Sequence, residues 1–273
     1  MRVIICSNEQ AVAKEAYKLL RDRVVNGGAK VLGLPTGSTP IKLYGEIVKG
    51  YQRQEIDFSD VHSFNLDEYL GLPPEHEQSY RNFMNKNLFE HINIKQDNTH
   101  FLDGLCDDIE GECMAFEALM EDLGGIKLQI LGIGRDGHIG FNEPGTPLNS
   151  RTSYVTLAPE TIEDNKRFFK SADEVPRWAL SMGVGSILEA REIMLLATGA
   201  SKAEAIAGMI EGPICSMNTA SALQLHERVT VILDEAAAGQ LQRKEHYMKT
   251  GGSDNIAQMY AYLMAARKKA GLD

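Results

Sequence analysis

Three side chains that can move protons lie close together in one glycine-rich stretch of the chain. Asp136, His138 and Glu143 fall within eight positions, after an apolar run that ends in glycine. A carboxylate beside an imidazole can fix the tautomer of the ring and raise its pKa, and a second carboxylate can relay protons. General acid–base chemistry on a small polar substrate needs such a set. The same residues would also suit a metal cluster, and Gly-, Asp- and Asn-rich runs are often only surface turns.

A second candidate is the loop at 35–40, which reads Pro-Thr-Gly-Ser-Thr-Pro. It follows a short apolar strand pattern and precedes a helical one, with Pro40 expected at the first helical position. Backbone N–H groups at such a helix start can bind a phosphate. The loop lacks the Gly-Lys-Ser/Thr ending of a nucleotide P-loop, so ATP is not implied. An ordinary capped turn between strand and helix explains the pattern equally well.

Two further segments place charged side chains directly after an expected strand. Asp67 and Glu68 follow the strand-like residues 61–66, although adjacent carboxylates alone usually mark a solvated turn. Lys202 is expected in the first turn of a helix, where a cation is unfavourable for the helix dipole. An anion bound by Lys202 would account for that local cost.

The surrounding elements indicate how these segments come together. Apolar strand patterns alternate with helical ones, which predicts an α/β fold of three layers, a mostly parallel sheet with helices on both faces. In such a sheet the carboxyl ends of the strands share one edge, so the candidate residues can converge there. Ser7-x-x-Gln10 predicts a capping box at the first helix. The last helix carries Met259, Tyr260 and Leu263 on one face and should dock on the body or on a neighbouring subunit.

Composition limits the class of protein. The chain has 273 residues, 43% of them hydrophobic and 24% charged, as in a globular protein. Neither a membrane helix nor a signal region is expected, and the four cysteines form no Cys-x-x-Cys pair, so we expect a cytoplasmic protein with reduced thiols. The formal net charge of −10 argues against nonspecific nucleic-acid binding. An anionic substrate would therefore need a local positive site.

The central stretch resembles the signature of a known family. Gly132-x-Gly134-x-Asp136-Gly137-His138-Ile139-Gly140-Phe141-Asn142-Glu143-Pro144 is similar to that of the glucosamine-6-phosphate deaminase (isomerase) family. The resemblance extends over nearly the whole chain, with further matching stretches at 33–40, 64–73, 165–169, 179–185 and 199–203. The 35–40 loop also resembles the phosphate-binding loop of the related 6-phosphogluconolactonases.

The resemblance implies a reaction and assigns roles to residues. Glucosamine 6-phosphate and water would give fructose 6-phosphate and ammonia, as part of amino-sugar catabolism. His138, oriented by Asp136 and Glu143, would shuttle the proton that opens the sugar ring. Asp67 would take the C2 proton and return it at C1. The residues expected to bind the phosphate are Thr36, Gly37, Ser38, Thr39, Arg167 and Lys202. No metal or organic cofactor is called for.

The expected organisation is a single domain over 1–273, with a lid segment near 151–180 and a helical tail near 251–273. The expected partner is a hexosamine 6-phosphate, without nucleic acid or membrane, and the chain would act as a monomer or homo-oligomer.

Other activities remain open on the same residues. A 6-phosphogluconolactonase normally carries Asp-Gly-His-Thr-Ala-Ser-Leu-Phe-Pro, whereas this chain departs after His138 and supplies Glu143. A galactosamine-6-phosphate deaminase would differ in substrate by one stereocentre. A catalytically inactive sugar-phosphate sensor should lack Asp67 or His138, and both are present.

Regulation is expected to differ from that of allosteric hexameric members of the family. Those members carry an Arg-x-Lys pair for the phosphate of an activator, and the matching positions here are Ser153 and Val155. Neither side chain carries a charge, so activation by N-acetylglucosamine 6-phosphate is not expected. Arg151 is the nearest alternative cation.

Overall fold

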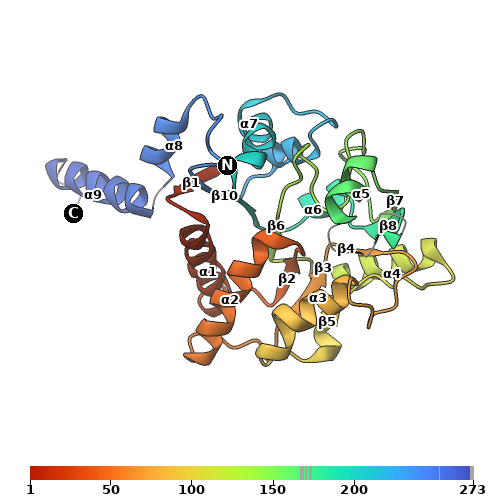
Figure 1. Cartoon of the computed structure of the whole chain (residues 1–273). Coiled ribbons are helices and arrows are strands. Elements are labelled where there is room, and N and C mark those ends of the chain that lie inside the picture. Colours follow the sequence, from red (N-terminus) through yellow and green to blue (C-terminus); the bar gives the residue numbers. More distant parts are fainter. Residues whose placement is uncertain (167–168, 170, 172–173, 252, 271–273) are drawn as a thin grey trace.

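The computed structural model describes residues 1–166, 169, 171, 174–251 and 253–270. Seven parallel strands form the central sheet in the order β1-β10-β9-β6-β2-β3-β5, and helices surround it (Figure 1). The strands are β1 (Arg2–Cys6), β2 (Val31–Leu34), β3 (His62–Asn65), β5 (Thr99–His100), β6 (Leu128–Leu131), β9 (Ile193–Ala197) and β10 (Val229–Asp234).

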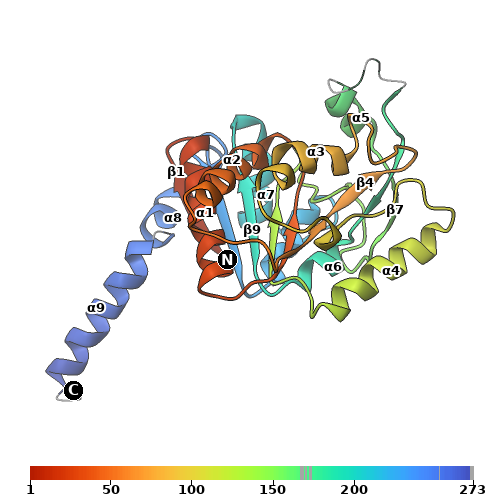
Figure 2. The same ribbon diagram turned by 90° about the horizontal axis from the view of Figure 1, so that it is seen from below.

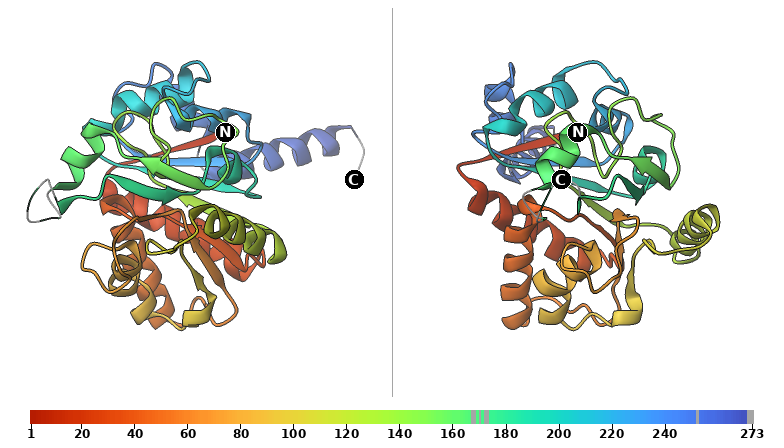
Figure 3. Two further views of the ribbon diagram at one scale, coloured as in Figure 1. Left: turned by 90° about the vertical axis from the view of Figure 1, so that its right-hand side faces the viewer. Right: turned by 45° about the vertical axis from the view of Figure 1, so that its right-hand side comes forward.

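Alternation along the strands produces two hydrophobic cores, one on each face of the sheet. In β10, for example, Val231 and Leu233 belong to one core and Ile232 to the other. The second core is closed by α1 (Glu9–Val25), α2 (Ser38–Gln52) and α3 (Tyr80–Asn87). The first is closed by α4 (Ile109–Asp122), α6 (Val184–Leu188) and α7 (Ala203–Glu211). The predicted three-layer α/β fold is confirmed, with the two helical layers on opposite sides of the sheet (Figure 3).

The order in which successive strands are added to the sheet reverses between β2 and β6. From β2 it continues outward to β3 and β5, whereas from β6 it continues the other way to β9 and β10. The two halves therefore diverge at the carboxyl ends of β2 and β6. Ligands of open α/β sheets bind at such a switch point.

A second, antiparallel sheet of three strands was not predicted. It has the order β4-β8-β7, with β4 (Asp67–Tyr69), β8 (Trp178–Ser181) and β7 (Ser153–Thr156). The placement of Asp67 and Glu68 in a loop after a strand is therefore wrong. They form a strand because β8, far along the chain, pairs with them, Asp67 opposite Ser181. The helix α5 (Pro159–Asn165) follows β7 and begins at Pro159.

Two expected helix starts are corrected. The N-cap of α1 is Asn8, whose side chain accepts from the backbone N–H of Ala11, so the Ser7 capping box is wrong. Asn caps helices as well as Ser does, and the local pattern does not separate two such neighbours. The helix α2 begins at Ser38, so Pro40 is its third residue and not its first.

The C-terminal part leaves the body of the protein. The helix α8 (Lys244–Thr250) packs against β1, and Arg2 Nε donates to the carbonyl of Gly251 over 2.7 Å. The helix α9 (Ser253–Lys269) then projects away (Figure 2), with Met259, Tyr260 and Leu263 exposed. The expected docking on the body is thus not seen for the described part of α9. None of the helices described is both long and apolar enough to span a membrane.

Short 3-10 helices complete the described elements. They span Phe89–His91, Gln96–Asn98, Ala200–Lys202 and Thr219–Leu225.

Candidate active site

One pocket at the carboxyl edge of the sheet collects most of the predicted site. Its volume is ≈ 410 Å³. The sequence-predicted residues that line it are Thr36, Gly37, Ser38, Thr39, Asp67, His138 and Lys202. Asp136 and Glu143 contact His138 from outside the lining. Arg167 lies outside the described residues. The structure therefore brings together segments that follow β2, β3, β6 and β9.

Asp67 provides a buried carboxyl on one side of the pocket. The residue is 6% exposed. Burial and the neighbouring Glu68 raise the pKa of Asp67 to about 8, against a smaller lowering by His138. At neutral pH this carboxyl is mainly protonated in the free protein. A cationic substrate beside it would favour the ionised form, which can accept a proton.

Glu68 points away from Asp67 and holds the start of α3, a role that the sequence did not indicate. Its carboxylate accepts from the backbone N–H of Tyr80 over 2.9 Å and of Arg81 over 3.0 Å. Successive residues of a strand face opposite sides, so Asp67 can face the pocket while Glu68 binds the helix. Only the pairing of β4 with β8 makes this division visible.

Asp136, His138 and Glu143, the proton-relay cluster, lie in contact after β6. His138 Nδ1 is 2.8 Å from Asp136 Oδ1 and 3.5 Å from Glu143 Oε2. Asp136 is close enough to share a proton with the ring, but it lies out of line with the ring N–H. Nδ1 and Oε2 are both buried without a hydrogen bond of good geometry to any described residue.

Charges within the proton-relay cluster set its protonation. Burial lowers the pKa of His138, but the close contact with the charged Asp136 and the charge of Glu143 outweigh this and raise it. For Asp136, burial acts upward, whereas the contact with His138 dominates and lowers the pKa to about 2. An ionised Asp136 beside an imidazole that can be neutral or positively charged is suited to proton transfer near neutral pH.

Two glycines, Gly134 and Gly140, let the loop backbone pass close to side chains of the site. A Cβ at Gly134 would lie 2.4 Å from the His138 ring, so any larger residue would displace the imidazole. Gly140 adopts φ +58, and a Cβ there would lie 3.1 Å from Ser181 Oγ and 3.5 Å from Asp67 Oδ2. The loop backbone thus passes close to the carboxyl of Asp67, which glycine permits.

The same pocket is also lined by groups suited to an anion. The helix α2 starts at Ser38 beneath Gly37, which adopts φ 102 and provides no side-chain cap. The first N–H groups of α2 thus have no side-chain acceptor from the N-cap, and a phosphate could satisfy them. Lys202, at the start of α7, lines the same pocket and lowers the pKa of His138 through its charge.

An aromatic cluster forms one wall of the pocket. Tyr80 stacks on Phe141 with ring centroids 5.8 Å apart, and Tyr69 lies 4.9 Å from Tyr80 and 5.5 Å from Phe141. Phe169, beyond α5, contacts Tyr69 edge-on at 6.0 Å. These side chains join Leu157 and Ala179 in a third hydrophobic cluster between the antiparallel sheet and α5.

The proton-relay cluster also fulfils the loose spacing of a metal site. Its ligand atoms all lie within 4.8 Å of one another. However, Zn²⁺ at ~2.0–2.2 Å from each ligand in a tetrahedral site keeps ligand atoms about 3.3 Å apart. The 2.8 Å between His138 Nδ1 and Asp136 Oδ1 is a hydrogen-bonding distance. The geometry thus favours proton transfer over metal binding.

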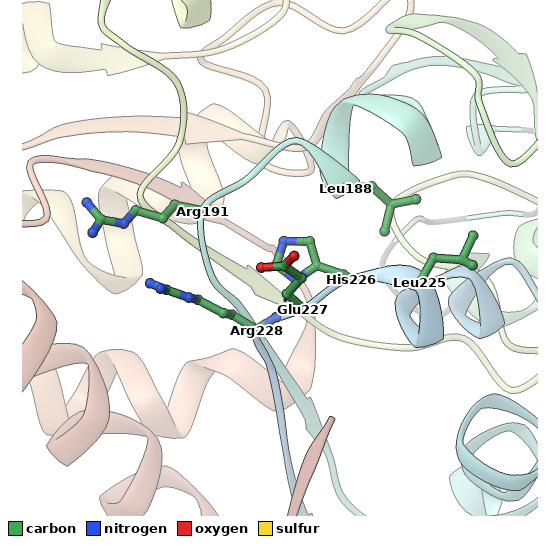
Figure 4. A pocket seen from close by; sticks show the side chains of 6 residues that line it. All are labelled: Leu188, Arg191, Leu225, His226, Glu227 and Arg228. Atoms are coloured by element: carbon green, nitrogen blue, oxygen red, sulfur yellow. Dashed lines mark hydrogen bonds between the residues drawn. The ribbon is translucent and has the colours of Figure 1, made fainter.

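A second cleft lies at the amino edge of the sheet, before β9 and β10 (Figure 4). Arg191 and Arg228 lie side by side there, near His226. The imidazole is held by the backbone, since Nε2 is 2.7 Å from the Ala190 carbonyl and Nδ1 accepts from the N–H of Arg228. None of the predicted site residues that the structure describes lines this cleft.

Comparison with known proteins identifies the class to which this fold and pocket belong. The family described as glucosamine-6-phosphate isomerases/6-phosphogluconolactonase matches residues 7–232, and the chain belongs to that family. The glucosamine-6-phosphate deaminase of Hahella chejuensis is 51% identical over 267 residues, 96% of this chain and 100% of the relative. The glucosamine-6-phosphate deaminase of Clostridioides difficile is 50% identical over 246 residues, 90% of this chain and 99% of the relative.

Solved structures separate the two branches of the family. A monomeric glucosamine-6-phosphate deaminase superposes with a TM-score of 0.86 at 42% identity, covering 88% of this chain and 100% of its own. The 6-phosphogluconolactonase of Trypanosoma cruzi superposes with a TM-score of 0.72 at 22% identity, covering 88% of this chain and 97% of its own. The lactonase therefore shares the fold, whereas the deaminases are similar in sequence as well.

Proposed function

We propose that the chain converts glucosamine 6-phosphate and water to fructose 6-phosphate and ammonia. The observation that carries this proposal is that two acid–base groups and an anion site line one pocket. The buried Asp67 carboxyl and the His138 imidazole line it together with the start of α2 and Lys202. The similarity to deaminases at about half of all positions supports the same substrate.

The geometry supports a mechanism in stages. The phosphate binds at the start of α2 and Lys202, which places the sugar between Asp67 and His138. His138 moves a proton between the ring oxygen and the C1 hydroxyl, so the ring opens. Asp67, ionised beside the substrate ammonium, takes the C2 proton and returns it at C1. The resulting C2 imine adds water, ammonia leaves, and fructose 6-phosphate remains. Remote phosphate contacts hold C1 and C2 in place through these steps.

Glu143 is the acidic residue by which this loop departs from the lactonase pattern. Ring opening moves a proton onto and then off the His138 imidazole, and a nearby carboxylate assists both steps. The carboxylate of Glu143 lies 3.5 Å from His138 Nδ1 and stabilises the charged imidazole. The carboxylate that distinguishes this loop from the lactonase pattern therefore acts on His138.

The assay that tests the proposal supplies glucosamine 6-phosphate, galactosamine 6-phosphate and 6-phosphogluconolactone separately to the purified protein. We expect ammonia from glucosamine 6-phosphate and no acceleration of lactone hydrolysis. Faster ammonia release from galactosamine 6-phosphate would assign the other stereoisomer, and lactone hydrolysis without ammonia would overturn the proposal.

The proposal extends to the organisation of the chain. The catalytic domain spans 1–273, with a lid segment near 151–180 that contains α5 and a helical tail near 251–273 that contains α9. The tail lies beyond residues 7–232, where the family matches. The reaction belongs to amino-sugar catabolism in the cytoplasm and needs no metal or organic cofactor.

Removal of metal ions checks the acid–base assignment. Activity should survive exhaustive chelation, because proton transfer by Asp136, His138 and Glu143 requires no metal ion, and elemental analysis should find no stoichiometric metal. Loss of activity on chelation with recovery on adding Zn²⁺ or Mn²⁺ would instead make Asp136, His138 and Glu143 metal ligands.

Kinetic regulation gives a further prediction. A phosphorylated activator needs a cationic pocket in one state of the protein. Ser153 and Val155 on β7 offer no charge, and Arg151 is bound by Glu117 and Glu189. We expect hyperbolic kinetics, with no activation by millimolar N-acetylglucosamine 6-phosphate. A sigmoidal rate curve that this ligand straightens would show an effector site built from other residues.

A further inference from the structure

Glu143 connects the proton-relay cluster to the helix α5. One carboxylate oxygen, Oε2, lies 3.5 Å from His138 Nδ1. The other, Oε1, accepts from the hydroxyl of Thr161 over 2.6 Å and from the backbone N–H of Ala158 over 3.2 Å. The two oxygens of one side chain therefore face two different parts of the site, the imidazole and the lid segment.

These contacts are shielded from water. Glu143 is 9% exposed and Thr161 is 6% exposed. A buried carboxylate depends on protein donors, because few waters can replace them. Ala158 precedes α5 and provides no side-chain cap. Glu143 thus accepts from the residue before α5 and from Thr161 within it, and the Thr161 hydroxyl makes the shorter of the two bonds.

The hydroxyl also determines where the rest of the carboxylate points. A carboxylate rotates about its terminal bond with little resistance, because that torsion is broad. Binding Oε1 in place removes this freedom and leaves Oε2 toward His138. Without the hydroxyl, Oε1 would keep the longer bond from Ala158 alone, and the orientation of Oε2 would no longer be held.

The same helix packs over the aromatic wall of the pocket. Ile162, next to Thr161, packs against the cluster that contains Phe141 and Tyr69. Thr161 itself lines the pocket. Packing of α5 on this cluster places the hydroxyl against Glu143, so the position of α5 over the pocket and the orientation of Glu143 are linked through this contact.

We propose that Thr161 is a positioning residue that holds Glu143 toward His138, so the proton-relay cluster is complete only when α5 is seated over the pocket. This proposal rests on the proposed function, since it concerns the ring-opening proton transfer of that reaction. Thr161 does not touch the reacting atoms and acts through Glu143.

The experiment compares Thr161→Val, which keeps the shape and removes the hydroxyl, with Thr161→Ser, which keeps the hydroxyl. Thr156→Val, on the exposed end of β7 before α5, is the matched control. For Thr161→Val we expect kcat on glucosamine 6-phosphate to fall about ten- to hundredfold, as for loss of a hydrogen bond to a charged group. Thr161→Ser and Thr156→Val should stay within about threefold of the wild type.

A second readout separates positioning from structure. The alditol 2-amino-2-deoxyglucitol 6-phosphate cannot form a ring, so its binding needs no ring opening. Its dissociation constant should change less than about threefold in Thr161→Val, while the solvent deuterium isotope effect on kcat should rise because proton transfer becomes slower. If the valine variant does not fold, Thr161→Ala, which needs less space, is measured in the same way.

Several results would overturn the proposal. Wild-type kcat in Thr161→Val, equal losses in the valine and serine variants, or alditol binding weakened as much as kcat would each do so. A wild-type protein that releases no ammonia from glucosamine 6-phosphate would instead refute the proposed function, so the two failures are distinguishable.

Discussion

Replacing Asp67 by Asn should lower kcat on glucosamine 6-phosphate by at least ~10²-fold, with a much smaller change in KM. Asn keeps the size and polarity of the side chain but cannot accept the C2 proton, and the loss of a general base costs about 10²- to 10⁴-fold. Steady-state kinetics decide this. Near-normal turnover would remove Asp67 from the mechanism, and Asp60→Asn, an exposed carboxylate before β3, serves as the control.

The pH dependence of the wild type gives a second check on Asp67. The base must be ionised, so kcat/KM should rise with pH through the pKa of about 8 in the free protein. The substrate ammonium lowers that pKa in the complex, so the rise in kcat should occur at lower pH. A wild-type kcat/KM that does not rise near pH 8 would contradict the assignment. So would a rise near pH 8 that persists in Asp67→Asn.

Stability should change in the opposite direction to activity. The pKa of Asp67 is raised from an ordinary value of about 4 to about 8 on folding, so its contribution is fully present below pH 4 and is lost as pH rises to 8. Asn carries no charge and avoids this loss. Denaturant unfolding should therefore show the variant gaining stability relative to the wild type between pH 5 and pH 8.

Loss of the phosphate contacts should have the other large effect. Lys202→Ala should raise KM for glucosamine 6-phosphate, since a charge-assisted contact is worth about 1.5–3 kcal/mol, or about ten- to hundredfold. Arg167→Ala is expected to act in the same direction from its place in the family pattern. Lys18→Ala, on the exposed side of α1, should leave KM unchanged.

Free glucosamine tests the whole anion site at once. It lacks the group that the start of α2 and Lys202 would hold, so its kcat/KM should be lower than that of the 6-phosphate by more than any single variant loses. Comparable rates on glucosamine and its 6-phosphate would show that the 35–40 loop is only a turn between β2 and α2.

The alternation of strands and helices made the central sheet predictable, because both faces of a parallel sheet are covered and each strand reads as an apolar run. The same rule located Thr36 to Thr39, His138 and Lys202 at one edge. The antiparallel sheet was missed because β4 has three residues, two of them acidic, and forms only through pairing with the distant β8.

Contacts that depend on long-range packing were also beyond the local pattern. Glu68 looks like half of a solvated acidic pair until α3 is placed against it. Thr161 is one polar residue in a short helix, and its bond to Glu143 arises only when α5 folds over the aromatic cluster. Thr161 lies in none of the stretches that match the family, and Glu68 lies in one, at 64–73, that does not separate its role from that of Asp67.

The central claim is that one pocket both isomerises and deaminates a hexosamine 6-phosphate. The most direct test follows ammonia and fructose 6-phosphate together during the reaction of the purified protein with glucosamine 6-phosphate. We expect the wild type to form equal amounts of the two products at every time. With His138→Ala, both products should form far more slowly than with the wild type. Ammonia without fructose 6-phosphate, or neither product from the wild type, would contradict the central claim.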